Sequence, residues 1–158
     1  MIWAINIGAT VLTYLIMEFV AWSTHKYVMH GLLWVLHRDH HRKDHEHVLE
    51  RNDAFFLIFA LPAIVLFLLG AQHGIADVRI WIGLGITLYG LSYFLVHDVF
   101  IHQRAKWLRR TDNRYFRAIR RAHKMHHKHL GKEDGECFGM LLVPPRYFAE
   151  ERSHSERP

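Results

Sequence analysis

The chain has 158 residues, 51% of them hydrophobic, which is enough for a single domain over 1–158 and too little for two. Its formal net charge is +5, and it contains 15 histidines but only one cysteine, Cys137. A single cysteine excludes an intramolecular disulfide, a zinc ribbon and an iron–sulfur cluster, so metal chemistry in this chain must use other ligands.

Three apolar segments follow one another along the chain, at residues 2–22, 54–71 and 80–96. The first contains a single charged residue, Glu18, and the other two contain none. Segments of ~17–21 residues form helices of roughly 26–32 Å, which matches a ~30 Å hydrocarbon core. We therefore predict an all-α integral membrane helical bundle with three spans. Whether residues 138–148 add a fourth membrane-embedded element stays open.

Basic residues are concentrated on one side of this predicted topology. Residues 23–53 carry five Lys and Arg and residues 97–158 carry fourteen, whereas the link 72–79 carries only Arg79. The positive-inside rule therefore places 23–53 and 97–158 in the cytoplasm, where we expect them to form a helical cap. Because this charge flanks membrane spans, it does not indicate nucleic-acid binding.

Ten of the 15 histidines fall into two motifs, HxxxxH and HxxHH, and each motif occurs twice. The first copy provides His25, His30, His37, His40 and His41, and the second provides His97, His102, His123, His126 and His127. On an α-helix, positions i, i+3 and i+4 lie within an arc of ~100°, so the three imidazoles of HxxHH share a face. Positions i and i+5 lie ~140° apart, so HxxxxH requires either a distorted helix or a site between helices.

Clustered neutral nitrogen ligands favour iron, zinc or copper over magnesium or calcium. Ten imidazoles exceed the capacity of one ion and suit a dinuclear site. Nearby carboxylates would balance its charge and orient the imidazoles, and the candidates are Asp39, Asp53 and Asp98. Glu18, inside a span, is a fourth candidate, with pairing between helices or snorkelling as its alternative roles. The isolated histidines His45, His47, His73, His129 and His154 are not expected to bind metal.

The motifs HKYVMH, HRDHH, HDVFIHQR and HKMHH, followed by GKEDGECFGMLLVPP, resemble the bacterial β-carotene hydroxylase family of the fatty acid hydroxylase superfamily. The resemblance extends from Glu18 to Pro145. It implies a non-haem di-iron monooxygenase of the bacterial inner membrane in which the ten motif histidines ligate two iron ions, with zinc able to replace iron in preparations. It also implies hydroxylation of the β-ionone rings of β-carotene at C3 and C3′, which gives β-cryptoxanthin and zeaxanthin.

The same resemblance implies O₂ as co-substrate and electrons from NAD(P)H through a ferredoxin and its reductase. The basic run 117–132 is then a docking site for an acidic carrier or simply positive-inside charge. The substrate would reach the site from membrane lipid. Aromatic residues near the span ends either line its route or form an interfacial belt; these are Trp22, Tyr27, Trp34, Tyr89, Tyr93 and Phe94.

Two alternatives remain at this point. One is a related hydroxylase or desaturase that acts on a fatty acyl chain, a sterol or another carotenoid. The other is a non-enzymatic metal transporter or metal-storing membrane protein. Transporters place their ligands near the bilayer midplane, whereas these motifs lie at the ends of the spans, which favours the enzyme.

Overall fold

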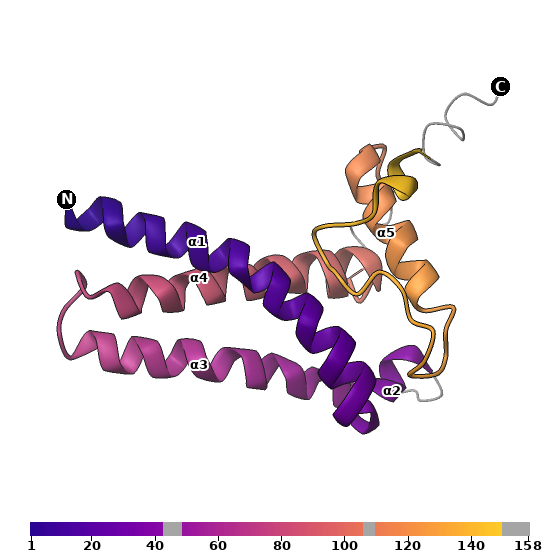
Figure 1. Ribbon diagram of the computed structural model, residues 1–158, viewed down its shortest axis with the longest axis horizontal. Helices are drawn as coiled ribbons and strands as arrows, with labels where there is room; N and C mark the ends of the chain where they lie inside the picture. Colours follow the sequence, from indigo (N-terminus) through magenta and orange to yellow (C-terminus); the bar gives the residue numbers. More distant parts are fainter. Residues whose placement is uncertain (43–48, 106–109, 150–158) are drawn as a thin grey trace.

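The computed structural model describes residues 1–42, 49–105 and 110–149, and within these ranges the chain is helical with no strand. The three long helices are α1 (Ile2–Ser23), α3 (Ala54–Ala71) and α4 (Val78–Tyr93). They run along one another as a bundle (Figure 1). With their flanking turns, all three are long and apolar enough to cross a membrane. The prediction of an all-α bundle with three spans is thus confirmed.

The shorter elements lie together at one end of this bundle (Figure 1). They are η1 (Thr24–Leu32), α2 (Trp34–His41), η2 (Arg51–Asp53), η3 (Phe94–Ile101) and α5 (Arg114–His126). We call these five elements, together with residues 102–105 and 127–149, the polar head. The N-terminus and the link between α3 and α4 lie at the opposite end of the bundle.

Helix α4 is the centre of the bundle, because it packs against both α1 and α3. Two glycines permit this. A Cβ on Gly85 would lie 2.7 Å from the backbone oxygen of Thr10 in α1, and a Cβ on Gly83 would lie 3.2 Å from the backbone oxygen of Ala63 in α3. Small residues that let two backbones approach closely are the usual means of helix association in lipid.

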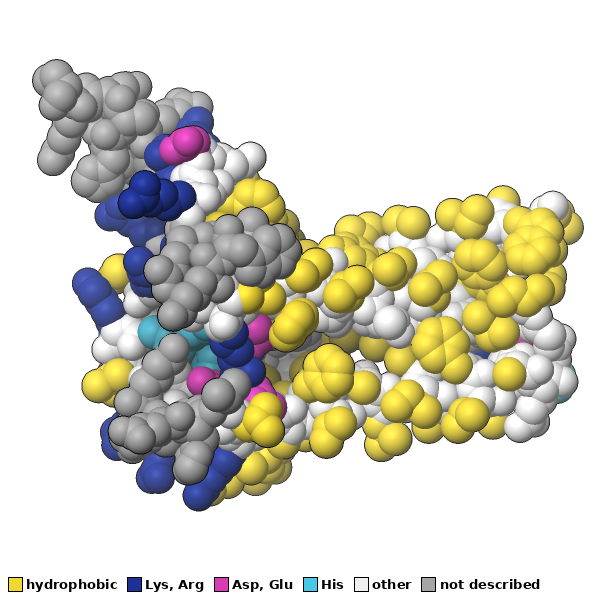
Figure 2. Space-filling view, turned by 180° about the vertical axis from the view of Figure 1, so that it is seen from behind, with side chains coloured by type: hydrophobic (Ala, Val, Ile, Leu, Met, Phe, Trp, Pro, Cys, Tyr) yellow, Lys and Arg dark blue, Asp and Glu magenta, His cyan; other side chains and the backbone are white. Residues whose placement is uncertain are grey.

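The outer surface of the bundle is apolar. Hydrophobic side chains cover the three long helices, whereas Lys and Arg gather on the polar head (Figure 2). Large apolar side chains such as Leu15, Phe19 and Leu57 are 63%, 66% and 69% exposed. Such a continuous apolar surface matches lipid rather than water as its solvent.

A buried carboxylate in α1, that of Glu18, holds residues 140–142 against the bundle. Oε1 of Glu18 accepts hydrogen bonds from the backbone N–H groups of Met140, Leu141 and Leu142 at 3.0, 2.9 and 2.9 Å. Its Oε2 accepts a hydrogen bond from the Tyr89 hydroxyl of α4 at 2.7 Å. Residues 135–144 are not helical, so no fourth helix covers this part of the chain, and a short helical turn occupies only 145–149.

Candidate metal centre

Both HxxxxH motifs lie in π-helices. η1 continues α1 and contains His25 and His30. η3 continues α4 and contains His97, and it ends at Ile101, directly before His102. The backbone bond from His102 N–H to the His97 carbonyl, at 2.9 Å, shows the i to i−5 pattern. In this geometry residue i+5 lies over residue i, so both imidazoles of a pair face the same way. The distorted helix that the motif required is therefore present, and π-turns are typical of functional sites.

The ten motif histidines come together in the polar head, and eight of them are buried. Nine form two groups in which the candidate ligand nitrogens lie within 4.8 Å of one another. The His25 set contains His25, His30, His37, His41 and His126, and the His40 set contains His40, His97, His102 and His123. The tenth, His127, lies beside the His40 set, with its ring centroid 4.8 Å from that of His40 and 4.5 Å from that of His123.

Each set combines histidines from both halves of the chain. His126 joins four histidines of the first half, and His40 joins three of the second. The sequence neighbours His40 and His41 belong to different sets. The three imidazoles of an HxxHH motif thus face one centre, as predicted, but they divide between its two parts.

The Nδ1 atoms of the His25 set face oxygen atoms that only accept hydrogen bonds. Four of these acceptors are main-chain carbonyls of one segment, 129–138, which wraps around the set. The contacts are His25 with Phe138 at 3.0 Å, His30 with Lys132 at 3.1 Å, His41 with His129 at 2.9 Å and His126 with Glu136 at 2.7 Å. The fifth acceptor is the side-chain oxygen of Asn52, 2.6 Å from His37.

These acceptors fix the tautomer of each ring. A neutral imidazole has one N–H, and here Nδ1 donates it, so Nε2 presents a lone pair to the interior. Burial keeps the rings neutral because it lowers the pKa of His37 to about 2, of His126 to about 3 and of His41 to about 4. Neutral imidazole is the form that ligates a metal.

The inward nitrogens are spaced as ligands of a common ion would be. Nε2 of His30 lies 3.2 Å from Nε2 of His126, and the Nε2 atoms of His40 and His97 are 3.0 Å apart. Two lone pairs repel at this distance unless a cation lies between them. Two nitrogens ~2.1 Å from one ion and at right angles are about 3.0 Å apart. In addition, Nε2 of His41 and of His127 are buried without a hydrogen-bond partner among the described residues. The donor set therefore fits transition-metal ions.

Carboxylates face the His40 set. Glu50 Oε2 accepts from His40 Nδ1 at 2.6 Å, and Asp98 Oδ2 accepts from His97 Nδ1 at 3.2 Å. The guanidinium of Arg104 joins these carboxylates, at 3.2 Å from Glu50, 3.3 Å from Asp98 and 2.9 Å from Asp53.

Of the four carboxylates proposed from the sequence, Asp98 has a hydrogen bond to a motif histidine. Glu18 instead binds residues 140–142 and Tyr89, as described above. Asp39 accepts a hydrogen bond from the Arg51 backbone at 2.6 Å, and Asp53 accepts one from the Glu50 backbone at 3.0 Å.

Sequence reasoning missed Glu50 and Asn52. Their only signal is position, because they stand directly before the second apolar segment, beside the candidate Asp53. Among the isolated histidines, His129 contributes its main-chain carbonyl to the centre, and His73 lies at the opposite end of the bundle. His45, His47 and His154 lie outside the described residues.

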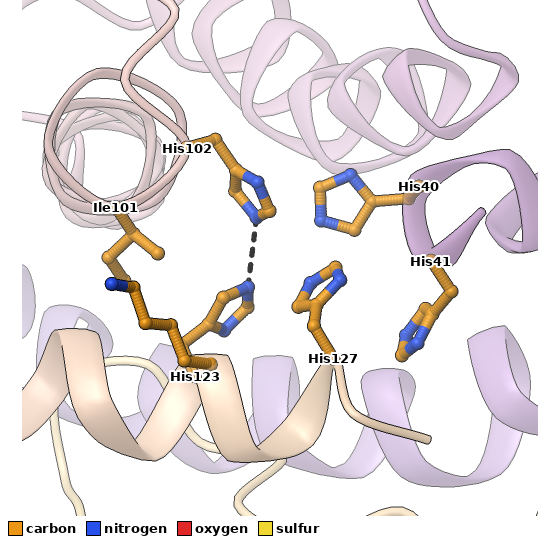
Figure 3. Close-up of a pocket in the computed structure, with 7 residues that line it drawn as sticks. His40, His41, Ile101, His102, His123 and His127 are labelled. Carbon is orange, nitrogen blue, oxygen red and sulfur yellow. Dashed lines mark hydrogen bonds between the residues drawn. The ribbon is translucent and has the colours of Figure 1, made fainter. Parts of the chain in front are cut away.

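Two cavities adjoin the centre. The first, of about 280 Å³, is lined by imidazoles of both sets and by His127 (Figure 3). The second, of about 640 Å³, is an apolar space between α1, α3 and α4 whose lining reaches Asn52, Asp53, His97 and Asp98 in the polar head. Of the six aromatic residues proposed for a substrate route, Tyr89, Tyr93 and Phe94 line this cavity. Trp22 and Tyr27 instead contact each other, with ring centroids 6.0 Å apart, and Trp34 packs on His30.

Comparison with known proteins shows that the chain is similar to hydroxylases. The family model described as "Fatty acid hydroxylase" matches residues 10–144. A "Beta-carotene hydroxylase" of Paracoccus sp. (strain PC1) is 42% identical over 85% of this chain and 82% of its own length, and that of Pantoea ananas is 39% identical over 92% and 81%. A chloroplastic "Beta-carotene 3-hydroxylase" of Gentiana lutea is 38% identical over 89% of this chain and 42% of its own length. No solved structure matches the chain.

Proposed function

Because this chain belongs to the fatty acid hydroxylase family, we propose that it is a β-carotene hydroxylase that acts at C3 and C3′ of the β-ionone rings. Its products would be β-cryptoxanthin and then zeaxanthin. The bacterial relatives support the substrate, and the name of the plant relative supports position 3. The observation that carries the proposal is the convergence of ten motif histidines on two adjoining ligand sets beside an apolar cavity.

We propose that the His25 set holds one iron ion and that the His40 set, completed by His127, holds the other, with zinc able to take the same positions. When bound, the ions would supply the activation of O₂ that a C–H hydroxylation requires. The chain itself holds the ligands in place. Asn52, Glu50 and the carbonyls of 129–138 orient six of the rings, so that the Nε2 atoms of these rings face inward before an ion arrives.

The apolar cavity between α1, α3 and α4 is the proposed site for a carotenoid ring. Its walls come mainly from aliphatic and aromatic side chains of these helices, and His97 of the His40 set is part of its lining. An apolar hydrocarbon dissolved in lipid enters such a space without crossing water. The same walls exclude water from the reacting carbon and aim the ring at the His40 set.

The remaining parts of the proposal concern location and electron supply. The single hydroxylase domain, 1–158, would lie in the bacterial inner membrane with the polar head in the cytoplasm. The concentration of Lys and Arg on that head supports this orientation (Figure 2). Electrons would come from NAD(P)H through a ferredoxin. The basic run 117–132 would receive an acidic carrier of this kind, and positive-inside charge is the alternative explanation of the same residues.

Expression in a bacterial host that accumulates β-carotene tests the proposal by product analysis. We expect β-cryptoxanthin and zeaxanthin from the natural chain and unchanged β-carotene from His126→Ala, which removes a ligand from the His25 set. His129→Ala is the matched control, because it keeps the main-chain carbonyl that binds His41 and removes only a side chain outside both sets. Unchanged β-carotene from an iron-loaded natural protein supplied with electrons would contradict the proposal.

The two alternatives are tested in the same system. Hydroxylated sterols or fatty acyl chains in place of carotenoid products would indicate a related hydroxylase. Metal movement into vesicles, without any O₂-dependent product, would indicate a transporter. The location of every motif histidine in the polar head, rather than midway along the bundle, supports the enzyme over the transporter.

A further inference from the structure

The two histidine sets differ in the charge of the groups that accept from their Nδ1 atoms. Every acceptor of the His25 set is neutral, since four are main-chain carbonyls and the fifth is the amide oxygen of Asn52. In the His40 set, by contrast, His40 and His97 donate to the carboxylates of Glu50 and Asp98.

The contact between Glu50 and His40 is the shorter of the two and is well shielded from solvent. Its length is 2.6 Å, and the side chains are 8% and 1% exposed. A short hydrogen bond from a neutral N–H to a charged oxygen is stronger than one to a carbonyl, and burial reduces its screening by water. Arg104 lies 3.2 Å from this carboxylate, and the same guanidinium also contacts Asp53 and Asp98, so three carboxylates gather behind the His40 set around one arginine.

A carboxylate that accepts the Nδ1 proton makes its imidazole a stronger electron donor through Nε2, because it draws the proton toward itself. A more strongly donating ligand stabilises the oxidised form of a bound metal relative to the reduced form. Carbonyl and amide acceptors have this effect to a smaller degree. The chain therefore provides two positions with similar ligand atoms but different electron donation.

We propose that Glu50, assisted by Asp98, makes the His40 set the more electron-rich of the two ion positions, so that an iron ion there is harder to reduce than one in the His25 set. This inference rests on the proposed function, since it assumes two iron ions. It also gives the electron-rich position a ligand in the wall of the apolar cavity, because His97 is the one motif histidine in a lining that also contains Asn52, Asp53 and Asp98. Glu50 thus acts as a positioning residue through His40, without touching the substrate.

Two opposite substitutions test the proposal. Glu50→Gln removes the charge behind the His40 set but keeps an oxygen that accepts from His40. Asn52→Asp places a charge behind His37 in the His25 set. Asp39→Asn is the control, since it removes a carboxylate that is adjacent in sequence to His40 but hydrogen-bonded to the Arg51 backbone.

The measurements are iron content, Mössbauer spectra of the reduced ⁵⁷Fe-loaded protein and a redox titration in detergent. For the natural chain we expect two quadrupole doublets of equal area. Glu50→Gln should shift one doublet and raise one midpoint potential, whereas Asn52→Asp should shift the other doublet and lower the other potential. Asp39→Asn should leave both doublets in place.

A single doublet in the natural chain, or a shift of the same doublet by both substitutions, would overturn the proposal. If Glu50→Gln does not retain iron, Asn52→Asp decides, since a lowered midpoint potential supports the proposal and an unchanged one overturns it. The product assay separates this inference from the proposed function. Doublets that respond as expected in a protein that leaves β-carotene unchanged would support the inequality of the two positions and refute only the carotenoid activity.

Discussion

At the scale of single residues, main-chain carbonyls orient more of these imidazoles than side-chain oxygens do, since four Nδ1 atoms face carbonyls and three face side chains. Residues 129–138 accept hydrogen bonds from four imidazoles of the His25 set, and the next part of the segment binds to Glu18. Glu18 therefore holds in place the segment that orients these rings. A charged group inside a membrane span has a structural reason here, because four donors satisfy it.

Replacement of Glu18 by Ala should lower the free energy of unfolding by at least about 3 kcal/mol, because three N–H groups and one hydroxyl lose their acceptor and each costs ~1–3 kcal/mol. Unfolding by denaturant in detergent micelles measures this loss. Glu18→Gln is the control, since its amide oxygen still accepts from the N–H groups, and we expect it to cost less than half as much. Equal stability of Glu18→Ala and the natural chain would show that these bonds contribute nothing.

At the scale of secondary structure, the change from α- to π-helix determines where the histidines lie. α1 and α4 are regular within the bundle, and each becomes a π-helix where it enters the polar head. This change brings His25 over His30 and His97 over His102. The bundle itself depends on the close approach of α4 to its neighbours.

Gly85→Ala tests this close approach. The new Cβ would lie 2.7 Å from the Thr10 backbone oxygen, which moves only with α1 as a whole. We expect a loss of about 1–3 kcal/mol in unfolding free energy, as for other overpacked sites. Gly8→Ala in α1 is the matched control. A Cβ there meets no atom within 4 Å, so its higher helix propensity should stabilise the protein by up to ~1 kcal/mol. Similar effects of both substitutions would argue against a tight contact at Gly85.

Gly90 tests the apolar cavity. It lines that cavity, and a Cβ at this position meets no atom within 4 Å. Gly90→Leu should therefore fill the space without moving a helix and lower product formation roughly 10- to 100-fold by displacing the substrate ring. Product analysis measures the fall, and iron content checks that the centre is intact. Gly8→Leu, on the exposed side of α1, should retain activity. Full activity of Gly90→Leu would place the substrate elsewhere.

At the scale of the whole molecule, the proposed ions would connect α5 to helical elements with which it has few other contacts. Within the described residues, α5 has few contacts with the helical elements outside the metal centre, apart from η3. Its His123 and His126 nevertheless belong to the two different ligand sets. An ion in either set would therefore join α5 to the helices of the first half.

Removal of iron with a chelator should lower the midpoint of thermal unfolding. An ion that binds only the folded chain stabilises it by about 3–4 kcal/mol at 100 to 1,000 times its dissociation constant. Thermal scans in detergent, before and after chelation, measure the difference. The response should persist in His129→Ala and be smaller in His126→Ala, which has one ligand fewer. Unfolding that does not change on chelation would mean that the ions do not join α5 to the helices of the first half.

The sequence by itself determined the helical bundle, its three spans and the identity of the ten clustered histidines. These features are local, because the length of an apolar segment and the spacing of residues along a helix depend only on residues that are close in the sequence. The assignment of Asp98 also followed from its place beside His97. The side of the membrane occupied by the polar head stays a prediction based on charge.

Only the tertiary structure decided how the histidines divide into two sets and what lies behind each ring. His40 and His41 separate although they are neighbours, because consecutive helix positions point about 100° apart. Their ring centroids lie 6.3 Å apart, and the ring of His127 contacts both, at 4.8 and 4.4 Å. The hydrogen bonds from the imidazoles to Glu50 and to the carbonyls of 129–138 are seen only in the folded chain. The reason is physical: every residue has a carbonyl, so composition and spacing do not reveal which carbonyls will meet an imidazole from another helix.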